Sequence, residues 1–230
     1  MVSISLKNVQ LDFPITYSDN RSLRNNLAQS FKNKNDNFNF KTSLKEINLE
    51  IKEGDVVGVL GPNGSGKSSL LRIIAGIYYP NFGSVIVKGK VLTLLDLNTG
   101  LEPESTGYEN IYLLSYTRGY SKDQINKFID KVVEFSDLQE AIFKPVRTYS
   151  SGMMSRLSAS MILHFDADIL LLDEFISTGD KFFKEKFDNF MEKKLINSKI
   201  VMLATHDEKL VKKLCNKIIY LNFGKIDKIE

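Results

Sequence analysis

The sequence is poor in cysteine and in long apolar runs. Cys215 is its only cysteine, so the chain cannot form an internal disulfide, which fits a reducing compartment. No apolar run approaches the roughly 18 residues that a membrane-spanning helix needs, and the N-terminus lacks the basic-then-apolar pattern of a signal peptide. Any role at a membrane is therefore expected to depend on a partner.

Excess charge of one sign is also missing. The 31 basic and 28 acidic residues give a net charge of +3, which is too balanced to indicate a nucleic-acid-binding protein, so no nucleic-acid partner is expected. Hydrophobic residues make up 43% and charged residues 26% of the 230 positions, as in ordinary globular proteins. A single domain over residues 1–230 is expected.

A continuous apolar run leads directly into a glycine-rich loop. Residues 56–60 (VVGVL) are typical of a strand buried on both faces, and residues 61–68 then fit the pattern G-x-x-x-x-G-K-[ST] before a predicted helix over residues 68–75. In this context backbone N–H groups close around phosphates, Lys67 reaches the terminal phosphates, and Ser68 can ligate Mg²⁺. The predicted phosphate-binding residues are Gly61, Pro62, Asn63, Gly64, Ser65, Gly66, Lys67, Ser68 and Ser69.

Two adjacent acids follow a second buried strand, predicted over residues 169–172. Asp173 is expected to bind in the outer coordination shell of Mg²⁺, and Glu174 is expected to accept a proton from the attacking water. On an ordinary exposed loop these acids would mean little. Together with the phosphate loop they predict a hydrolase.

The two histidines have different surroundings. His206 follows a buried strand predicted over residues 199–204, so it is expected at the same edge of the sheet as the phosphate loop, within reach of the γ-phosphate. His164 lies inside an apolar run and is expected to be structural. The predicted catalytic residues are Lys67, Glu174 and His206.

The rest of the chain predicts an α/β fold with a mainly parallel core sheet. Alternating residues 3–9 and 43–51 indicate half-buried strands, separated by a polar insertion over residues 18–41 that carries a short amphipathic helix or a surface loop. A helical subdomain is expected over about residues 100–147, where Ser121 and Gln124 form a capping box.

Tyr149-Ser150-Ser151-Gly152-Met153 precedes a predicted helix, so it either caps that helix or holds an anion. The order of phosphate loop, this segment, the Asp173-Glu174 pair and Thr205-His206-Asp207 resembles the ATP-binding subunits of ABC transporters from end to end. The resemblance implies a P-loop NTPase fold of the ABC type, with an N-terminal antiparallel β-subdomain and a helical subdomain, and it implies ATP and Mg²⁺ as cofactors.

The resemblance also implies that two copies pair head-to-tail. In that family the signature segment of one subunit contacts the γ-phosphate held by the other, which here assigns Ser150, Ser151 and Gly152 to the opposite site. Asp180 matches the D-loop across the same interface. A kinase or GTPase with the same phosphate loop is the alternative in which this segment is only a cap.

Departures from the common family pattern indicate a branch. The signature Tyr-Ser-Ser-Gly-Met followed by Arg156 and Leu157, the Thr-Gly-Asp of the D-loop, and residues 94–101 look like subunits that export O-antigen, capsular polysaccharide or teichoic acid. This implies a separate polytopic membrane permease and a peripheral place on the cytoplasmic face of the inner (plasma) membrane. The alternatives are a soluble ABC ATPase not coupled to transport and an exporter of another substrate.

Three further expectations follow from the resemblance. Asp96 or Asn98 replaces the usual glutamine near the metal, with Asp96 as the predicted metal ligand. The aromatic residue that stacks on adenine is Phe13 or Tyr17, with Tyr17 favoured. The sequence stops at Glu230 without the carbohydrate-binding domain of some O-antigen exporters, so export without that selection step is expected.

Overall fold

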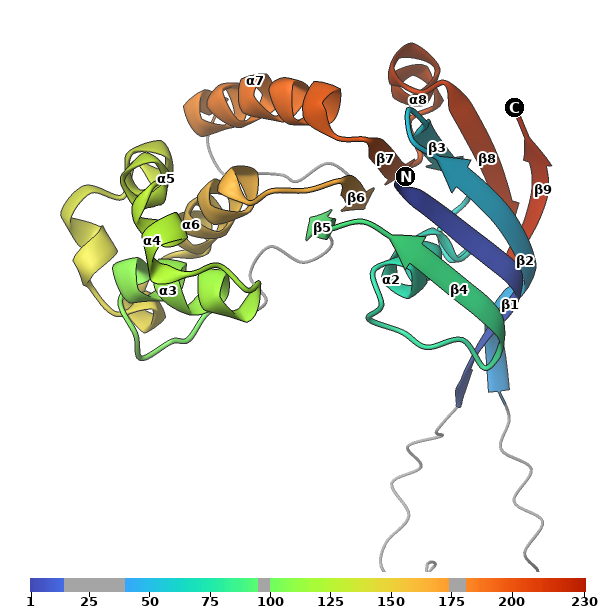
Figure 1. Cartoon of the computed structure of the whole chain (residues 1–230), viewed down its shortest axis with the longest axis horizontal. Helices are drawn as coiled ribbons and strands as arrows, with labels where there is room; N and C mark the ends of the chain where they lie inside the picture. Colours follow the sequence, from blue (N-terminus) through green and yellow to red (C-terminus); the bar gives the residue numbers. More distant parts are fainter. Residues whose placement is uncertain (15–39, 95–99, 174–180) are drawn as a thin grey trace, which may run out of the picture.

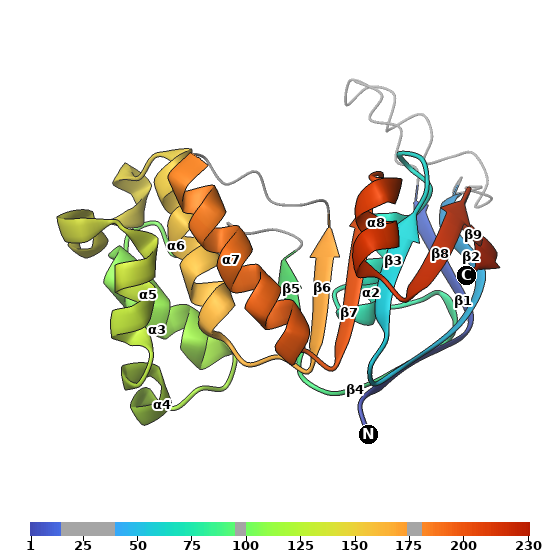
Figure 2. The ribbon, with the colours of Figure 1, turned by 90° about the horizontal axis from the view of Figure 1, so that it is seen from above.

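The structure is a computed structural model that describes residues 1–14, 40–94, 100–173 and 181–230 (Figure 1). The polar insertion predicted over residues 18–41 lies almost wholly outside this part of the chain. In the described residues most of the helices gather at one side of the molecule, and the two sheets form the other side together with the remaining helices (Figures 1 and 2).

The smaller sheet is antiparallel and has the strand order β2-β1-β4. Its strands are β1 (Ser3–Pro14), β2 (Phe40–Lys52) and β4 (Phe82–Lys88). Alternate side chains of β1 and β2 are buried, which is the period-2 pattern that the sequence displayed. This sheet is the predicted N-terminal antiparallel subdomain.

The larger sheet has the order β5-β6-β7-β3-β8-β9 and is parallel except for the hairpin that joins its last two strands. Its strands are β3 (Val56–Leu60), β5 (Val91–Leu94), β6 (Ile169–Asp173), β7 (Ile200–Thr205), β8 (Lys217–Asn222) and β9 (Lys225–Ile229). The continuous apolar strands are buried on both faces, as predicted for a covered parallel sheet.

Each face of this sheet has its own core. On β6, Ile169 and Leu171 face the small sheet and helix α2 (Lys67–Ile74), whereas Leu170 and Leu172 face the helical side. Full burial of one such side chain contributes about 1.5–3 kcal/mol, so two cores fix both the register and the tilt of the strand. The edge of the sheet that carries the loops is thereby held rigidly.

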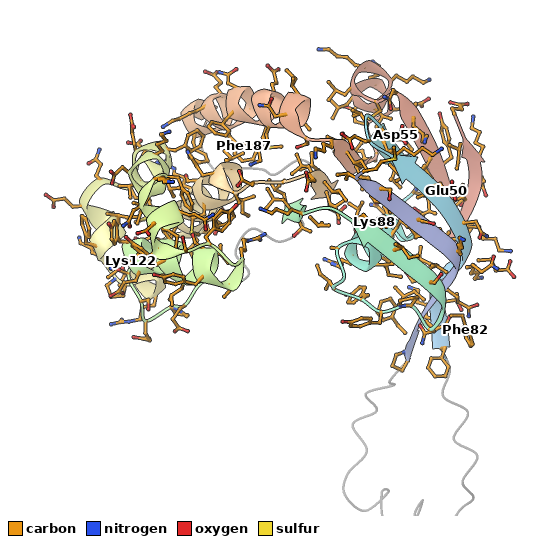
Figure 3. The ribbon with its side chains drawn as sticks, in the orientation of Figure 1. Glu50, Asp55, Phe82, Lys88, Lys122 and Phe187 are labelled. Atoms are coloured by element: carbon orange, nitrogen blue, oxygen red, sulfur yellow. The ribbon has the colours of Figure 1, made fainter. Side chains whose placement is uncertain are left out.

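The helical side consists of short helices packed on two longer ones. They are α3 (Gly107–Thr117), α4 (Lys122–Asn126), α5 (Ile129–Ser136), the 3₁₀ turns η1 (Gln139–Phe143) and η2 (Val146–Thr148), α6 (Ser151–His164) and α7 (Lys181–Asn197). Phe187, labelled in Figure 3 below α7, is buried in the core of this region. Helix α8 (Glu208–Leu214) lies instead on the larger sheet, where Val211 packs with Leu60 and Ile218. No helix in the described ranges has both the length and the apolar character needed to cross a membrane.

The predicted capping box is confirmed. The Gln124 backbone N–H donates to Ser121 Oγ over 3.3 Å, and the Ser121 backbone N–H donates to Gln124 Oε1 over 2.8 Å. A second box at Thr106 and Glu109 starts α3 and was not predicted. Each cap contributes about 1 kcal/mol, which helps to form helices this short.

Candidate nucleotide site

The predicted phosphate loop joins β3 to α2 and needs glycine at defined positions. Gly64 and Gly66 have positive φ angles of 77° and 107°, which side chains rarely tolerate. A Cβ at Gly66 would lie 2.7 Å from the Ser43 carbonyl oxygen, and one at Gly61 would lie 2.1 Å from the Leu221 carbonyl oxygen. The loop therefore packs directly on neighbouring backbone.

Lys67 is the first residue of α2, and its side chain crosses the loop. Its Nζ donates to the Gly61 carbonyl over 2.8 Å and to the Pro62 carbonyl over 3.2 Å, and the residue is only 6% exposed. No carboxylate in the described residues forms an ion pair with this ammonium group. Phosphate oxygens can take the place of the two carbonyls without a carboxylate competing for the charge.

A cavity of about 740 Å³ opens beside the loop, a volume suited to a nucleotide. It is lined by Phe13, Lys41, Thr42, Ser43, Lys45, Asn63, Gly64, Gly66, Lys67, Ser68, Ser69, Asp173, Phe223 and Gly224. Six of the nine predicted phosphate-binding residues, Lys67 included, line this cavity, and so does the predicted metal ligand Asp173. Three of its residues are lysines, so the cavity suits an anionic ligand.

The donors also fit a divalent cation. Ser68 Oγ and the Asp173 carboxylate line the same cavity, and hard oxygen donors are the ones that Mg²⁺ prefers. Ser65 Oγ, inside the loop, is buried and has no hydrogen-bond partner among the described residues, as expected where a polar ligand completes the site. The residues present therefore fit both groups that the sequence predicted.

Strand register explains why these residues meet. Leu60 at the end of β3 pairs with Thr205 at the end of β7, and Ala204 pairs with Asp173 at the end of β6. The three strands thus end level at one edge of the sheet. His206, directly after β7, lies exposed at this edge.

His164 lies elsewhere and has a structural contact. Its Nδ1 lies 2.7 Å from the Ser160 carbonyl oxygen, within α6. Burial is the largest influence on the His164 ring and lowers its pKa. This agrees with the structural role predicted for it.

The signature segment forms a helix cap at some distance along the chain from the loop. Ser150 is the N-cap of α6, and its Oγ accepts a hydrogen bond from the Met153 backbone N–H over 3.2 Å. Ser150 and Ser151 are exposed, and Ser150, Ser151 and Gly152 are not among the residues that line the cavity. In Figure 2 the start of α6 and the carboxyl ends of β3 and β6 point to the same side of the molecule.

The sequence did not predict the support that the small sheet and the β8–β9 turn give to the loop. The Gly224 backbone N–H donates to the Ser65 carbonyl over 2.9 Å, and the Lys45 N–H donates to the Gly224 carbonyl over 2.7 Å. Ser43 Oγ donates to Ser69 Oγ over 2.8 Å. These partners are far apart in sequence, and no local pattern signals them.

Some predicted residues lie outside the described part of the chain. They are Tyr17, Asp96, Asn98, Glu174 and Asp180. Of the two aromatic candidates for adenine, Phe13 is described: it lines the cavity, and its ring packs edge-on against Tyr78 with centroids 5.4 Å apart.

A buried parallel strand, a glycine-rich loop with an inward lysine, and an acid at the level end of a nearby strand define a P-loop nucleotide-binding domain. The family described as ABC transporter matches residues 44–177, more than half of the chain. The chain therefore belongs to the ABC transporter family. The resemblance and the fold class predicted from the motifs are confirmed.

Relatives agree with the predicted branch. The O-antigen export system ATP-binding protein RfbE of Yersinia enterocolitica is 39% identical over 98% of this chain and 97% of its own length. The teichoic acids export ATP-binding protein TagH of Bacillus anthracis is 37% identical over 85% of this chain but only 35% of its own length. The O-antigen export system ATP-binding protein RfbB of Myxococcus xanthus is 38% identical over 82% of this chain and 43% of its own length.

A solved structure shares the fold over nearly the whole chain. The dimeric bacterial ABC transporter cassette MJ0796 has a TM-score of 0.70 and 25% identity, and the alignment covers 99% of this chain and 97% of that one. MJ0796 has also been solved as a dimer in a post-hydrolysis state bound to ADP and Pi, with a TM-score of 0.72 and 24% identity over the same shares of the two chains.

Proposed function

We propose that this chain is the ATP-binding and ATP-hydrolysing subunit of an exporter of polysaccharide of the O-antigen, capsule or teichoic-acid type. The observation that carries the proposal is the cavity beside the phosphate loop, which is lined by Lys67, Ser68 and Asp173. The relative that matches almost end to end is named as an O-antigen export ATP-binding protein, which supports the substrate class. A separate polytopic permease would carry the polysaccharide, with this chain peripheral on the cytoplasmic face of the plasma membrane.

The residues of the cavity divide the work on the triphosphate. Lys67 Nζ exchanges the carbonyls of Gly61 and Pro62 for phosphate oxygens, and the loop N–H groups close around the β-phosphate. Mg²⁺ would be held by Ser68, by Asp96 and, in the outer coordination shell of the metal, by Asp173. The ion would neutralise charge on the transferred phosphoryl group.

Two groups act at the attacking water. Glu174 follows Asp173 at the end of β6 and accepts the proton of the water as it attacks the γ-phosphate. His206 follows β7 at the same edge and reaches the γ-phosphate from the side. Phe13 gains support as the adenine contact because it lines the cavity, and Tyr17 remains the other candidate.

A second copy of the chain completes each site. Ser150, Ser151 and Gly152 lie at an exposed helix start, so the segment is free to meet the γ-phosphate of the opposite subunit. Asp180 would lie across the same interface. The dimeric arrangement of the MJ0796 cassette supports this assembly.

Substitution of Glu174→Gln tests the hydrolytic part of the proposal. The variant should bind ATP as tightly as the native chain, because the amide keeps the size of the side chain, but it cannot accept the proton. Turnover should fall at least about a hundredfold, and size-exclusion chromatography with ATP should show a trapped dimer. The matched control is Glu185→Gln, which removes an exposed carboxylate from α7 and should leave turnover unchanged. Unchanged steady-state hydrolysis by Glu174→Gln would remove this residue from its role.

A further inference from the structure

The turn between β8 and β9 contains a residue that its backbone disfavours. Phe223 and Gly224 have φ angles of 43° and 78°, and Asn222 pairs with Lys225 across the turn. A two-residue hairpin turn with both central φ angles positive favours Asn-Gly. A bulky residue at positive φ is a genuine outlier, so Phe223 occupies a position where asparagine would fold more easily.

Among the described residues the Phe223 side chain has little packing that would offset this conformation. It is 81% exposed. Within the described residues its ring forms no contact with another aromatic ring or with a cation. An unfavourable backbone and an unburied apolar ring together indicate a role outside the folding of the chain.

The turn holds Phe223 at the nucleotide cavity. Phe223 and Gly224 both line that cavity. The turn cannot move away, because the Gly224 N–H and carbonyl are hydrogen-bonded to Ser65 of the phosphate loop and to Lys45 of β2. A Cβ at Gly224 would lie 2.6 Å from the Ser43 carbonyl oxygen, so the backbone is tightly packed here as well.

The cavity lining separates into two kinds of surface. Lys41, Lys45 and Lys67 suit phosphates, whereas the aromatic rings at the cavity belong to Phe13 and Phe223. The Phe13 ring already packs against Tyr78, but in the described part of the chain the Phe223 ring has no aromatic neighbour. Aromatic faces stack on nucleobases whatever the base, because every base has a π-face.

We infer that Phe223 is a second aromatic contact to the nucleoside part of bound ATP, in addition to the aromatic residue contributed by the N-terminal segment. The inference rests on the proposed function, since it takes the cavity to be the ATP site. It adds a positioning residue that comes from the β8–β9 turn, and this residue contributes to affinity rather than to the chemistry of hydrolysis.

Substitution of Phe223→Asn tests the inference without putting folding at risk. Asparagine suits the turn, so the variant should unfold at the same temperature as the native chain or at a higher one. Its Kd for ATP, measured by titration calorimetry, should rise about five- to tenfold, while its Kd for inorganic triphosphate should not change. Phe223→Tyr, which keeps a ring, should bind ATP like the native chain.

The matched control is Ile196→Asn. Ile196 is 82% exposed near the end of α7, at the edge of the sheet opposite the phosphate loop, so this variant should bind ATP normally. Native affinity for ATP in Phe223→Asn would overturn the inference. Equal weakening of ATP and triphosphate would also overturn it, because Phe223 would then act on the loop. A native chain that binds neither ligand would instead overturn the proposed function, and the inference with it.

Discussion

Two helix starts in this chain look alike in sequence but are built differently. In the phosphate loop the N-cap of α2 is Gly66, which offers no side-chain cap, so the first N–H groups of that helix remain available to a ligand. In the signature segment the N-cap is Ser150, whose hydroxyl already caps α6 by accepting a hydrogen bond from the Met153 N–H. The start of α2 leaves its backbone N–H donors available to a phosphate, whereas at the start of α6 the Ser150 hydroxyl already accepts a hydrogen bond from one of these donors.

Their surroundings differ in the same direction. The phosphate loop lies in a cavity with an inward lysine and an acid, whereas the start of α6 is exposed. A ligand can therefore bind at the first helix start within one chain, whereas the proposed role of the second requires a ligand held by another copy. This difference is what the proposed site, shared between two copies, requires.

The largest expected effect comes from the phosphate loop. Lys67→Ala removes the ammonium group that is hydrogen-bonded across the loop, so ATP affinity should fall at least about tenfold and turnover about a hundredfold or more. Fluorescence titration with a labelled ATP analogue and a phosphate-release assay measure the two quantities. Lys213→Ala on the exposed surface of α8 is the matched control. Full ATP binding by Lys67→Ala would remove the distinction between the two helix starts.

The next largest effect is expected for a substitution in the signature segment, which should lower the rate of hydrolysis but not the affinity for ATP. Ser150→Arg places a bulky cation at the exposed start of α6, so each chain should still bind ATP within about twofold of native, because Ser150 does not line the cavity. Turnover should fall about a hundredfold, since the γ-phosphate loses its contact from the second copy. Ser150→Thr keeps both cap and hydroxyl and should retain most activity. If Ser150→Arg hydrolysed ATP normally, the segment would be only a cap.

Local patterns account for most of what the sequence predicted. The eight residues of the phosphate loop act through their own backbone and through Lys67, so a short motif contains the whole signal. Strands β6 and β7 were predictable because continuous apolar runs are characteristic of strands covered on both faces.

Contacts between distant segments were not predictable in this way. The Gly224 to Ser65 and Lys45 to Gly224 hydrogen bonds depend on how the two sheets pack, which a single sequence does not display. The capping box at Thr106 and Glu109 was predictable, because its Thr-x-x-Glu pattern is as local as the pattern at Ser121. Within the predicted helical subdomain, the Ser121 capping box separates α3 from α4, and a break at Phe128, which was not predicted, separates α4 from α5.

The most direct test of a shared site is to mix the two inactive variants. In a head-to-tail dimer of Lys67→Ala with Ser150→Arg, one site combines both defects and the other combines an intact phosphate loop with an intact signature segment. Random pairing in an equal mixture should therefore restore about a quarter of native turnover, although each variant alone is inactive. If the mixture stays as inactive as its components while the chains still exchange partners, each site lies within one chain and the account is wrong.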